Sequence, residues 1–353
     1  MAGFQLDKVV YYYYDLLNGQ EKIVYKDILN ALLNVKSDVN LSFNAPRDVV
    51  KKIIKYVTND RPDIFWYGEG CTLTLKNDLV EMITFDYRMS LSEVNAMKYR
   101  IVNSSFFREL DQLILSRTSD FDKALVAYEY IIKHTEYDCY ATGNNSVKCE
   151  YAYNMDGVVI KNKAVCSGYS KVFQYFMNRH GIYCTLVTGK TVKGRHSWNL
   201  IKLYGSYYYI DVTWSDPVFK NGAPKSPDFV LYDYFCITTE ELNKSHQVIF
   251  DNKMPPCVDT RCNYYRYYNM ISTSFSIEDI LSRIINAYRN GKQEAEIRYS
   301  SRQDYLIATR ELFDNKKIFD VLSKAKRVIV TIDDREANFS RDEDVNIIKI
   351  KIR

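Results

Sequence analysis

The chain has 353 residues, of which 46% are hydrophobic and 26% are charged, a balance typical of a soluble globular protein. No stretch approaches the roughly 18 apolar residues that a membrane-spanning helix needs, so we expect no membrane insertion. The 48 basic and 44 acidic residues are interspersed and leave a net charge of only +4, which argues against nucleic acid as a partner. A chain of this length should form one large composite domain or two to three units.

The N-terminal residues 1–8 include an early acidic residue and lack the pattern of a secretory signal, so we expect a cytoplasmic protein. Eight cysteines are few for this length and should be reduced thiols. The 31 tyrosines are most simply explained as core and groove lining, and stacking platforms for bases or sugars are less favoured. Nothing in the sequence indicates a cofactor or a particular oligomeric state.

Residues 1–119 should form a mainly helical region that a strand pair interrupts. Apolar residues recur at helical spacing in 4–17 and 49–57. Residues 71–75 and 80–87 both alternate apolar and polar positions, and the polar residues between them suit a turn. We interpret this region as a lid or wall for the segment that follows.

Residues 120–256 should form the catalytic core. The spacing of apolar residues predicts a helix over 120–135. Residues 157–217 should form a loop, then a helix over 166–180 that Gly181 closes, and then three strands.

Residues 257–353 should form a connector and a small α/β unit. The tyrosine-rich stretch 262–270, which follows two adjacent prolines, is typical of a connector. The elements expected beyond it are a helix over 277–288, a strand over 295–299, a helix over 302–313, and strands over 328–332 and 345–352.

Cys166 stands at the expected start of a helix. Ser167 and Gly168 are small enough to allow a close backbone approach there. A cysteine in the first turn faces unpaired amide groups and the positive end of the helix dipole, and both favour the reactive thiolate form. Taken alone, such a cysteine is more often an inert packing residue, so the neighbouring motifs decide.

His196 and Asp211 are brought together by a predicted hairpin. Residues 194–203 alternate as a strand, and the two-residue turn 204–205 suits a type I′ geometry that leads into a returning strand over 206–214. In this register Asp211 lies on the same face as His196 and diagonal to it, within reach of the ring.

These three residue types are the ones that nucleophilic catalysis on a carbonyl needs. Cys166 would attack the carbonyl carbon and form a thioester, and His196 would move the proton between sulfur and the leaving amine. Asp211 would fix the tautomer of the ring and stabilise the imidazolium.

Three segments resemble the catalytic signature of the transglutaminase-like superfamily. Residues 165–169 read Val-Cys-Ser-Gly-Tyr, residues 196–199 read His-Ser-Trp-Asn, and residues 211–217 read Asp-Val-Thr-Trp-Ser-Asp-Pro. The resemblance covers roughly 130–236. It implies an α+β fold with a papain-like core, in which the helix with the cysteine packs on an antiparallel sheet with the histidine and the aspartate.

The resemblance also implies that Cys166, His196 and Asp211 are the catalytic triad of a compact, bacterial-type member. Amide bonds of proteins or peptides are the expected substrates, and hydrolysis by a cysteine peptidase is favoured slightly over transfer to an amine. The extra β domains and acidic calcium sites of animal transglutaminases have no counterpart here, so we expect no metal.

Further residues should contact the substrate or support the triad. They are Trp198, Asn199, Tyr169 and Trp214. Asp216 should lie beyond the strand and shape the groove. The amide of Cys166 is a natural donor to an oxyanion, and Trp66, Tyr153 or Trp198 could supply a second group.

Three alternatives are less favoured. Cys236, His246, Cys257 and Cys262 are zinc-type donors, but the spacing of the last two is poor for a zinc site. A peptide N-glycanase or an arylamine acetyltransferase would share the triad, but the former usually has zinc-binding cysteine pairs and the latter a different surround for its cysteine. A non-catalytic module could bind a peptide or glycan in a tyrosine-rich groove, although the intact triad argues against it.

Overall fold

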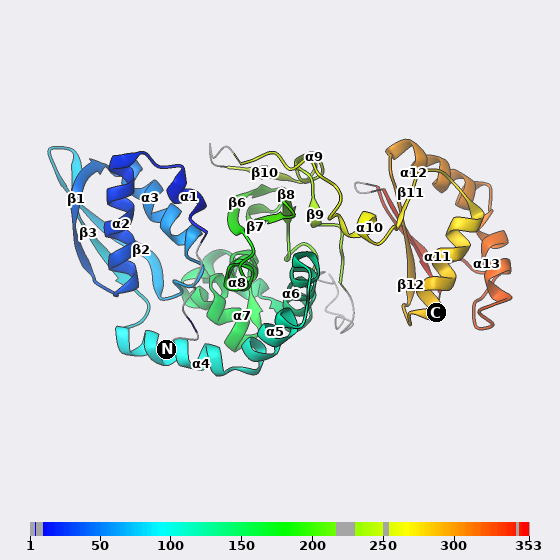
Figure 1. Ribbon diagram of the computed structural model, residues 1–353, viewed down its shortest axis with the longest axis horizontal. Coiled ribbons are helices and arrows are strands. Elements are labelled where there is room, and N and C mark those ends of the chain that lie inside the picture. Colours follow the sequence, from blue (N-terminus) through cyan, green and yellow to red (C-terminus); the bar gives the residue numbers. More distant parts are fainter. Residues whose placement is uncertain (1–3, 5–9, 217–229, 250–253, 344–345, 353) are drawn as a thin grey trace. The chain divides into compact units, whose positions relative to one another are not determined.

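The computed structural model describes residue 4 and residues 10–216, 230–249, 254–343 and 346–352 (Figure 1). The chain divides into two compact units, Met1–Asp259 and Thr260–Arg353. Each unit combines helices with its own sheet, which confirms the α+β fold class. A further division of the first unit at residue 119 stays a prediction.

The first unit holds three sheets. Its elements in chain order are α1 (Tyr12–Asp15), α2 (Gly19–Leu33), β1 (Asp38–Pro46), α3 (Arg47–Asp60), β2 (Tyr67–Lys76), β3 (Leu79–Tyr87), α4 (Leu91–Asn103), α5 (Ser105–Leu115), α6 (Asp120–His134), β4 (Glu136–Tyr137), the 3₁₀ helices η1 (Cys139–Ala141) and η2 (Gly143–Tyr153), α7 (Met155–Lys161), β5 (Lys163–Ala164), α8 (Cys166–Arg179), β6 (Cys184–Thr191), β7 (Gly194–Leu203), β8 (Ser206–Ile210), β9 (Phe235–Ile237), α9 (Thr239–Leu242) and β10 (His246–Val248). The strand orders are β1-β3-β2, β4-β5 and β10-β6-β7-β8-β9. All neighbours in the five-stranded sheet are antiparallel.

The predicted strand pair of the N-terminal region is confirmed as β2 and β3. The turn between them, Asn77–Asp78, has positive φ at both residues, as a type I′ turn requires. The expectation of only two strands was wrong, because β1 pairs antiparallel with β3. The helix predicted over 49–57 is confirmed as α3, whereas the helix predicted over 4–17 falls partly outside the described residues and is helical only in α1.

The N-terminal elements hydrogen-bond directly to the core of the first unit. The Tyr13 hydroxyl donates to the Leu186 carbonyl on β6 at 2.6 Å. The Gln174 side-chain amide on α8 donates to the Asn59 carbonyl at 2.8 Å. All four residues are buried, so these contacts are part of the interior of the unit.

The hairpin of β7 and β8 has the predicted register and turn. Tyr204 and Gly205 have φ of 48° and 86°, and the strands on either side pair without a bulge. The returning strand ends at Ile210 rather than at residue 214, because the Asp211 carboxylate accepts backbone N–H groups of the next residues and turns the chain. The loop expected from residue 157 was also wrong, since α7 occupies that segment.

Helix α8 packs on β6 and β7 and is buried over most of its length (Figure 1). The close approach predicted at its start is confirmed at Gly168, where a Cβ would lie 2.6 Å from the Ala152 carbonyl oxygen. The helix ends before Gly181, which has a φ of 77°.

The second unit is built around one four-stranded sheet in the order β11-β12-β14-β13. Its elements are α10 (Tyr264–Tyr267), β11 (Ile271–Ser272), α11 (Ile277–Arg289), β12 (Glu294–Tyr299), α12 (Arg302–Thr309), the π-helix η3 (Arg310–Asp314), α13 (Ile318–Lys326), β13 (Phe339–Asp342) and β14 (Ile347–Lys351). A short helix, α10, lies in the expected connector. The strand predicted over 328–332 was wrong: Ile329 and Ile332 are buried three residues apart, which is a turn-like rather than an alternating spacing.

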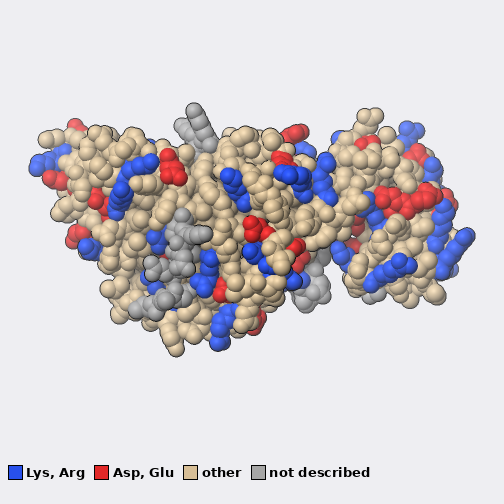
Figure 2. Space-filling model, in the orientation of Figure 1, with Lys and Arg blue, Asp and Glu red and all other residues tan. Residues whose placement is uncertain are grey.

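Among the described helices, none combines the length and apolar character that crossing a bilayer requires. On the face of the molecule in Figure 2, basic and acidic side chains are interspersed over the first unit.

Candidate active site

Cys166 is the first residue of α8, where the sequence predicts the helix to begin. Val165, the residue before it, makes no side-chain hydrogen bond to the first turn, and its carbonyl accepts the Gly168 N–H group at 2.9 Å. The Cys166 thiol is half-buried and near enough to His196 to interact electrostatically with its ring. Cys166 therefore lies at a helix N-terminus and beside an imidazole.

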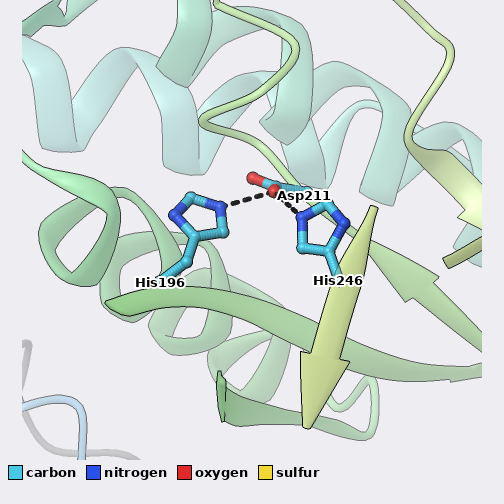
Figure 3. Close-up of side chains that lie close together, drawn as sticks. All are labelled: His196, Asp211 and His246. Carbon is cyan, nitrogen blue, oxygen red and sulfur yellow. Dashed lines mark hydrogen bonds and ion pairs between the residues drawn. The ribbon is translucent and has the colours of Figure 1, made fainter. Parts of the chain in front are cut away.

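His196 and Asp211 form a buried hydrogen-bonded pair (Figure 3). The Nε2 atom of His196 lies 2.6 Å from Oδ2 of Asp211, and the two residues are 8% and 1% exposed. Because Nε2 is engaged with the carboxylate, Nδ1 remains for the Cys166 thiol. The other carboxylate oxygen, Oδ1, accepts the backbone N–H groups of Thr213 and Trp214 at 2.9 and 3.0 Å.

A second histidine, His246, approaches the same carboxylate from β10 (Figure 3). Its Nε2 atom lies 3.0 Å from Oδ2 of Asp211, and its side chain is fully buried. From the sequence, His246 is only a weak candidate for zinc binding, and its place beside Asp211 is not predicted. No local motif could have shown it, because the pairing of β10 with the distant strand β6 places the ring there.

The histidines and Asp211 are the one group of described residues with potential metal ligands this close together. Ligand atoms bound to one tetrahedral zinc at about 2.0–2.2 Å lie roughly 3.3 Å apart. The observed nitrogen-to-oxygen distances of 2.6 and 3.0 Å are shorter and match hydrogen bonds. We therefore interpret the cluster as a hydrogen-bonded network rather than a metal centre.

The opposite charges of His196 and Asp211 shift the pKa of each residue so that both favour their ionised forms. Burial by itself lowers the pKa of His196, but the charge and hydrogen bond of Asp211 and the contact with Cys166 outweigh it and raise the pKa to about 10. Burial by itself raises the pKa of Asp211, but the charge and hydrogen bonds of His196 and His246 hold it well below its ordinary value. Imidazolium and carboxylate are therefore both favoured at neutral pH.

These shifts predict how the pair stabilises the fold as pH changes. The pKa of His196 is raised on folding, so its contribution is complete below pH about 6.5 and is lost as pH rises through about 10. The pKa of Asp211 is lowered, so its contribution is complete above pH about 3.9 and is lost only in stronger acid. In urea unfolding, the stability difference between wild type and His196→Gln should be largest at pH 4 to 6.5 and should shrink towards pH 10. A difference that stays constant across the alkaline range would contradict this.

Two predicted supporting residues bind or flank the triad. The Asn199 side chain donates to the Ser170 carbonyl on α8 at 3.0 Å, and the Ser170 hydroxyl donates back to the Ser197 carbonyl on β7 at 3.0 Å. These bonds fix the strand of His196 against the helix of Cys166. The Trp198 ring is buried with its centroid 6.0 Å from that of His196.

The other two predicted residues lie on different sides of the site. The Trp214 ring is half-buried with its centroid 5.9 Å from that of His196. The Tyr169 hydroxyl is buried and donates to Asp216 at 2.6 Å. The expectation that Asp216 shapes the groove was therefore wrong, since its carboxylate is taken by this buried bond.

Two of the oxyanion donors considered from sequence are already engaged. Trp66 Nε1 donates to the Leu32 carbonyl, and the Tyr153 hydroxyl donates to the Ala141 carbonyl. Trp198 Nε1, in contrast, is buried without an acceptor among the described residues. Of the three side chains, Trp198 keeps a free donor beside the site.

Gly189 on β6 lies directly opposite His196 in the sheet. A Cβ at this position would lie 2.2 Å from Cη2 of Trp198 and 2.3 Å from the Gln247 carbonyl oxygen on β10. We expect Gly189→Ala to lower the free energy of unfolding by about 3 kcal/mol, because this interior has no room for a methyl group. Urea unfolding would measure the loss.

Gly19 offers the matched control. It begins α2, and a Cβ there would meet nothing within 4 Å. Gly19→Ala should leave stability unchanged or slightly higher. Equal effects of the two substitutions would contradict the close packing under Trp198.

Comparisons with known proteins agree with this geometry. Residues 109–212, which include Cys166, His196 and Asp211, match the family described as the transglutaminase-like superfamily. The chain is 23% identical over 172 residues to the kyphoscoliosis peptidase of Mus musculus, a match that covers 45% of this chain and 25% of that protein. It is 25% identical over 141 residues to the kyphoscoliosis peptidase of Homo sapiens, covering 36% and 21%.

The chain thus spans a quarter or less of the length of these curated relatives. Among solved structures, a TGase is similar with a TM-score of 0.31 and 17% sequence identity, over 57% of this chain and 58% of that one.

Proposed function

We propose that this protein is a thiol enzyme that cleaves amide bonds of proteins or peptides through a thioester, because residues 109–212 match the transglutaminase-like superfamily. Cys166 is the nucleophile, His196 the acid and base, and Asp211 the residue that orients the ring. Water is the favoured acceptor, which makes the reaction a hydrolysis. The name peptidase of the two curated relatives supports this choice over transfer to an amine.

One observation carries the proposal: a single imidazole is hydrogen-bonded to a buried carboxylate and also interacts electrostatically with a thiol at a helix start. A buried structural histidine needs only one such partner. A thiol and a carboxylate on opposite nitrogens are what proton transfer to and from sulfur requires.

The first half of the reaction follows from these positions. The Cys166 thiolate attacks the carbonyl carbon, a carbon–sulfur bond forms, and the carbonyl electron pair moves onto oxygen. The backbone amide of Cys166, at the first position of α8, would donate to this oxyanion. The His196 imidazolium then gives its proton to the amide nitrogen, the carbon–nitrogen bond breaks, and the amine leaves.

The second half returns the enzyme to its starting state. Neutral His196 takes a proton from water, and the resulting oxygen nucleophile attacks the thioester carbon. The carbon–sulfur bond breaks, and sulfur leaves as the thiolate beside the imidazolium. An amine in place of water would give a transferred product by the same steps. The reaction needs a free thiol, which suits a reducing location such as the cytoplasm.

The test compares two products from one substrate. The protein is incubated with casein, with and without a fluorescent primary amine, and cleaved chains are separated from labelled chains. Cleavage without labelling is the expected result. Labelling in preference to cleavage would assign a transglutaminase. If neither product forms, the thiol does not turn over this substrate.

Alkylation tests the nucleophile without any choice of substrate. Iodoacetamide at neutral pH should modify Cys166 first, because its sulfur lies at a helix start beside the His196 ring, a setting typical of reactive cysteines. Cys139 is an exposed thiol and supplies the matched control. Cys139→Ala should leave the fast phase unchanged, and peptide mapping should find that phase at Cys166. A fast phase at Cys139 instead would overturn the assignment.

A further inference from the structure

We propose that His246 is a positioning residue of the site: it fixes the Asp211 carboxylate, which in turn holds the His196 ring against the Cys166 thiol. This inference rests on the proposed function of the triad. It adds a fourth group, which comes from a strand outside the three sequence motifs.

The bond to Asp211 is the first reason. Oδ2 of Asp211 accepts from His196 at 2.6 Å and from His246 at 3.0 Å, while Oδ1 accepts two backbone N–H groups. Without His246, the oxygen that faces the catalytic ring would keep only one donor. The carboxylate is fully buried, so water could not replace the lost bond at low cost.

His246 is itself held in one orientation. Its Nδ1 atom is hydrogen-bonded to the Ser245 hydroxyl at 2.7 Å. Its ring lies between two indoles, with centroids 4.9 Å from Trp198 and 4.5 Å from Trp214. A residue that served only as filler would not need a polar partner on each nitrogen. The ionised Asp211 can only accept, so Nε2 of His246 carries the hydrogen.

Phenols and one lysine face the cluster from other elements. Tyr128 on α6 and Tyr137 on β4 both interact with Asp211, and burial raises the pKa of each hydroxyl well above its ordinary value. Tyr234 packs on the His246 ring at 5.6 Å. Lys193 lies over the outer indole of Trp214, 5.9 Å from its centroid.

Two substitutions separate positioning from packing. His246→Gln keeps an N–H donor at the same reach but loses the aromatic ring. His246→Phe keeps the ring between the indoles but loses the donor. If His246 positions Asp211, the Gln variant should stay near wild type and the Phe variant should be impaired, and a packing role predicts the opposite order.

The readouts are the pH dependence of Cys166 alkylation and, on casein, kcat and KM. For His246→Phe we expect the ratio of alkylation rates at pH 6 and pH 9 to fall about tenfold, because a displaced imidazolium stabilises the thiolate less. We expect kcat to fall roughly 10- to 100-fold, with KM nearly unchanged. Circular dichroism and thermal unfolding report whether each variant is folded.

Ser245→Ala serves as a second variant that keeps the histidine. It removes the partner of Nδ1 and should change the same ratio in the same direction by about two- to fivefold. Wild-type profiles in both the Phe and the Ser245 variants, or impairment of Gln alone, would overturn the inference. Failure of the proposed function has a different signature: Cys166→Ala would keep the fast alkylation or the cleavage, whatever the residue at 246.

Discussion

Cys166→Ala is expected to lower kcat by about 10⁶-fold, because no other group in the site can form the thioester. The protein should remain folded. The thiol is half-buried at the start of α8, alanine is a good helix former, and the His196 ring keeps its hydrogen bond to Asp211. Steady-state cleavage of casein measures the loss, and thermal unfolding should give a midpoint close to that of wild type.

Cys257→Ala is the matched control for a cysteine outside the site. Its side chain is buried in a hydrophobic cluster that includes Leu242 of α9. Burial raises the pKa of the Cys257 thiol to about 12. This substitution should cost some stability and leave kcat within a factor of about two. Comparable losses in the two variants would mean that catalysis does not depend on the thiol of Cys166.

Asp211→Asn is expected to lower kcat by about 10⁴-fold, the second largest effect. The amide can still accept the N–H groups of Thr213 and Trp214 through its oxygen. Its NH₂ group would then point at Nε2 of His196, which must give up its hydrogen to accept that bond. The ring would be held in the wrong tautomer, with its proton on the nitrogen that faces sulfur.

The measurement is kcat/KM across pH, together with the unfolding midpoint. Asp211→Asn should lose the alkaline limb near pH 10, because the carboxylate that raises the pKa of His196 is gone. Asp216→Asn is a matched control, since Asp216 is also a buried carboxylate but binds Tyr169 rather than His196. An unchanged pH profile in Asp211→Asn would show that another group sets the state of the imidazole.

The parts of the site that the sequence predicts are those set by neighbouring residues. The turn Tyr204–Gly205 has a strong local preference, and it alone fixes the register that brings Asp211 next to His196. The start of α8 at Cys166 is likewise marked by the small residues after it. The packing of α8 against β7 is not determined by neighbouring residues in the sequence. Hydrogen bonds from the side chains of Asn199 and Ser170 across the interior hold the two elements together.

The errors arise where distant segments decide. β1 alternates apolar and polar residues over Asp38–Pro46, so its signal was present, but its partner β3 lies beyond a helix and another strand. His246 has no such signal, since one histidine in a three-residue strand is indistinguishable from a core residue. The strand predicted after Tyr204–Gly205 ends early because a side chain, that of Asp211, competes for the backbone.

The bonds from Tyr13 to Leu186 and from Gln174 to Asn59 limit where this chain can be divided. They join the first 60 residues to α8, which carries Cys166, and to β6, which pairs with the strand of His196. A fragment that begins at residue 120 would expose the partners of these bonds together with the apolar surface around them. The superfamily segment is therefore not a portable module in this chain, and fusions or truncations should keep the N-terminal elements with it.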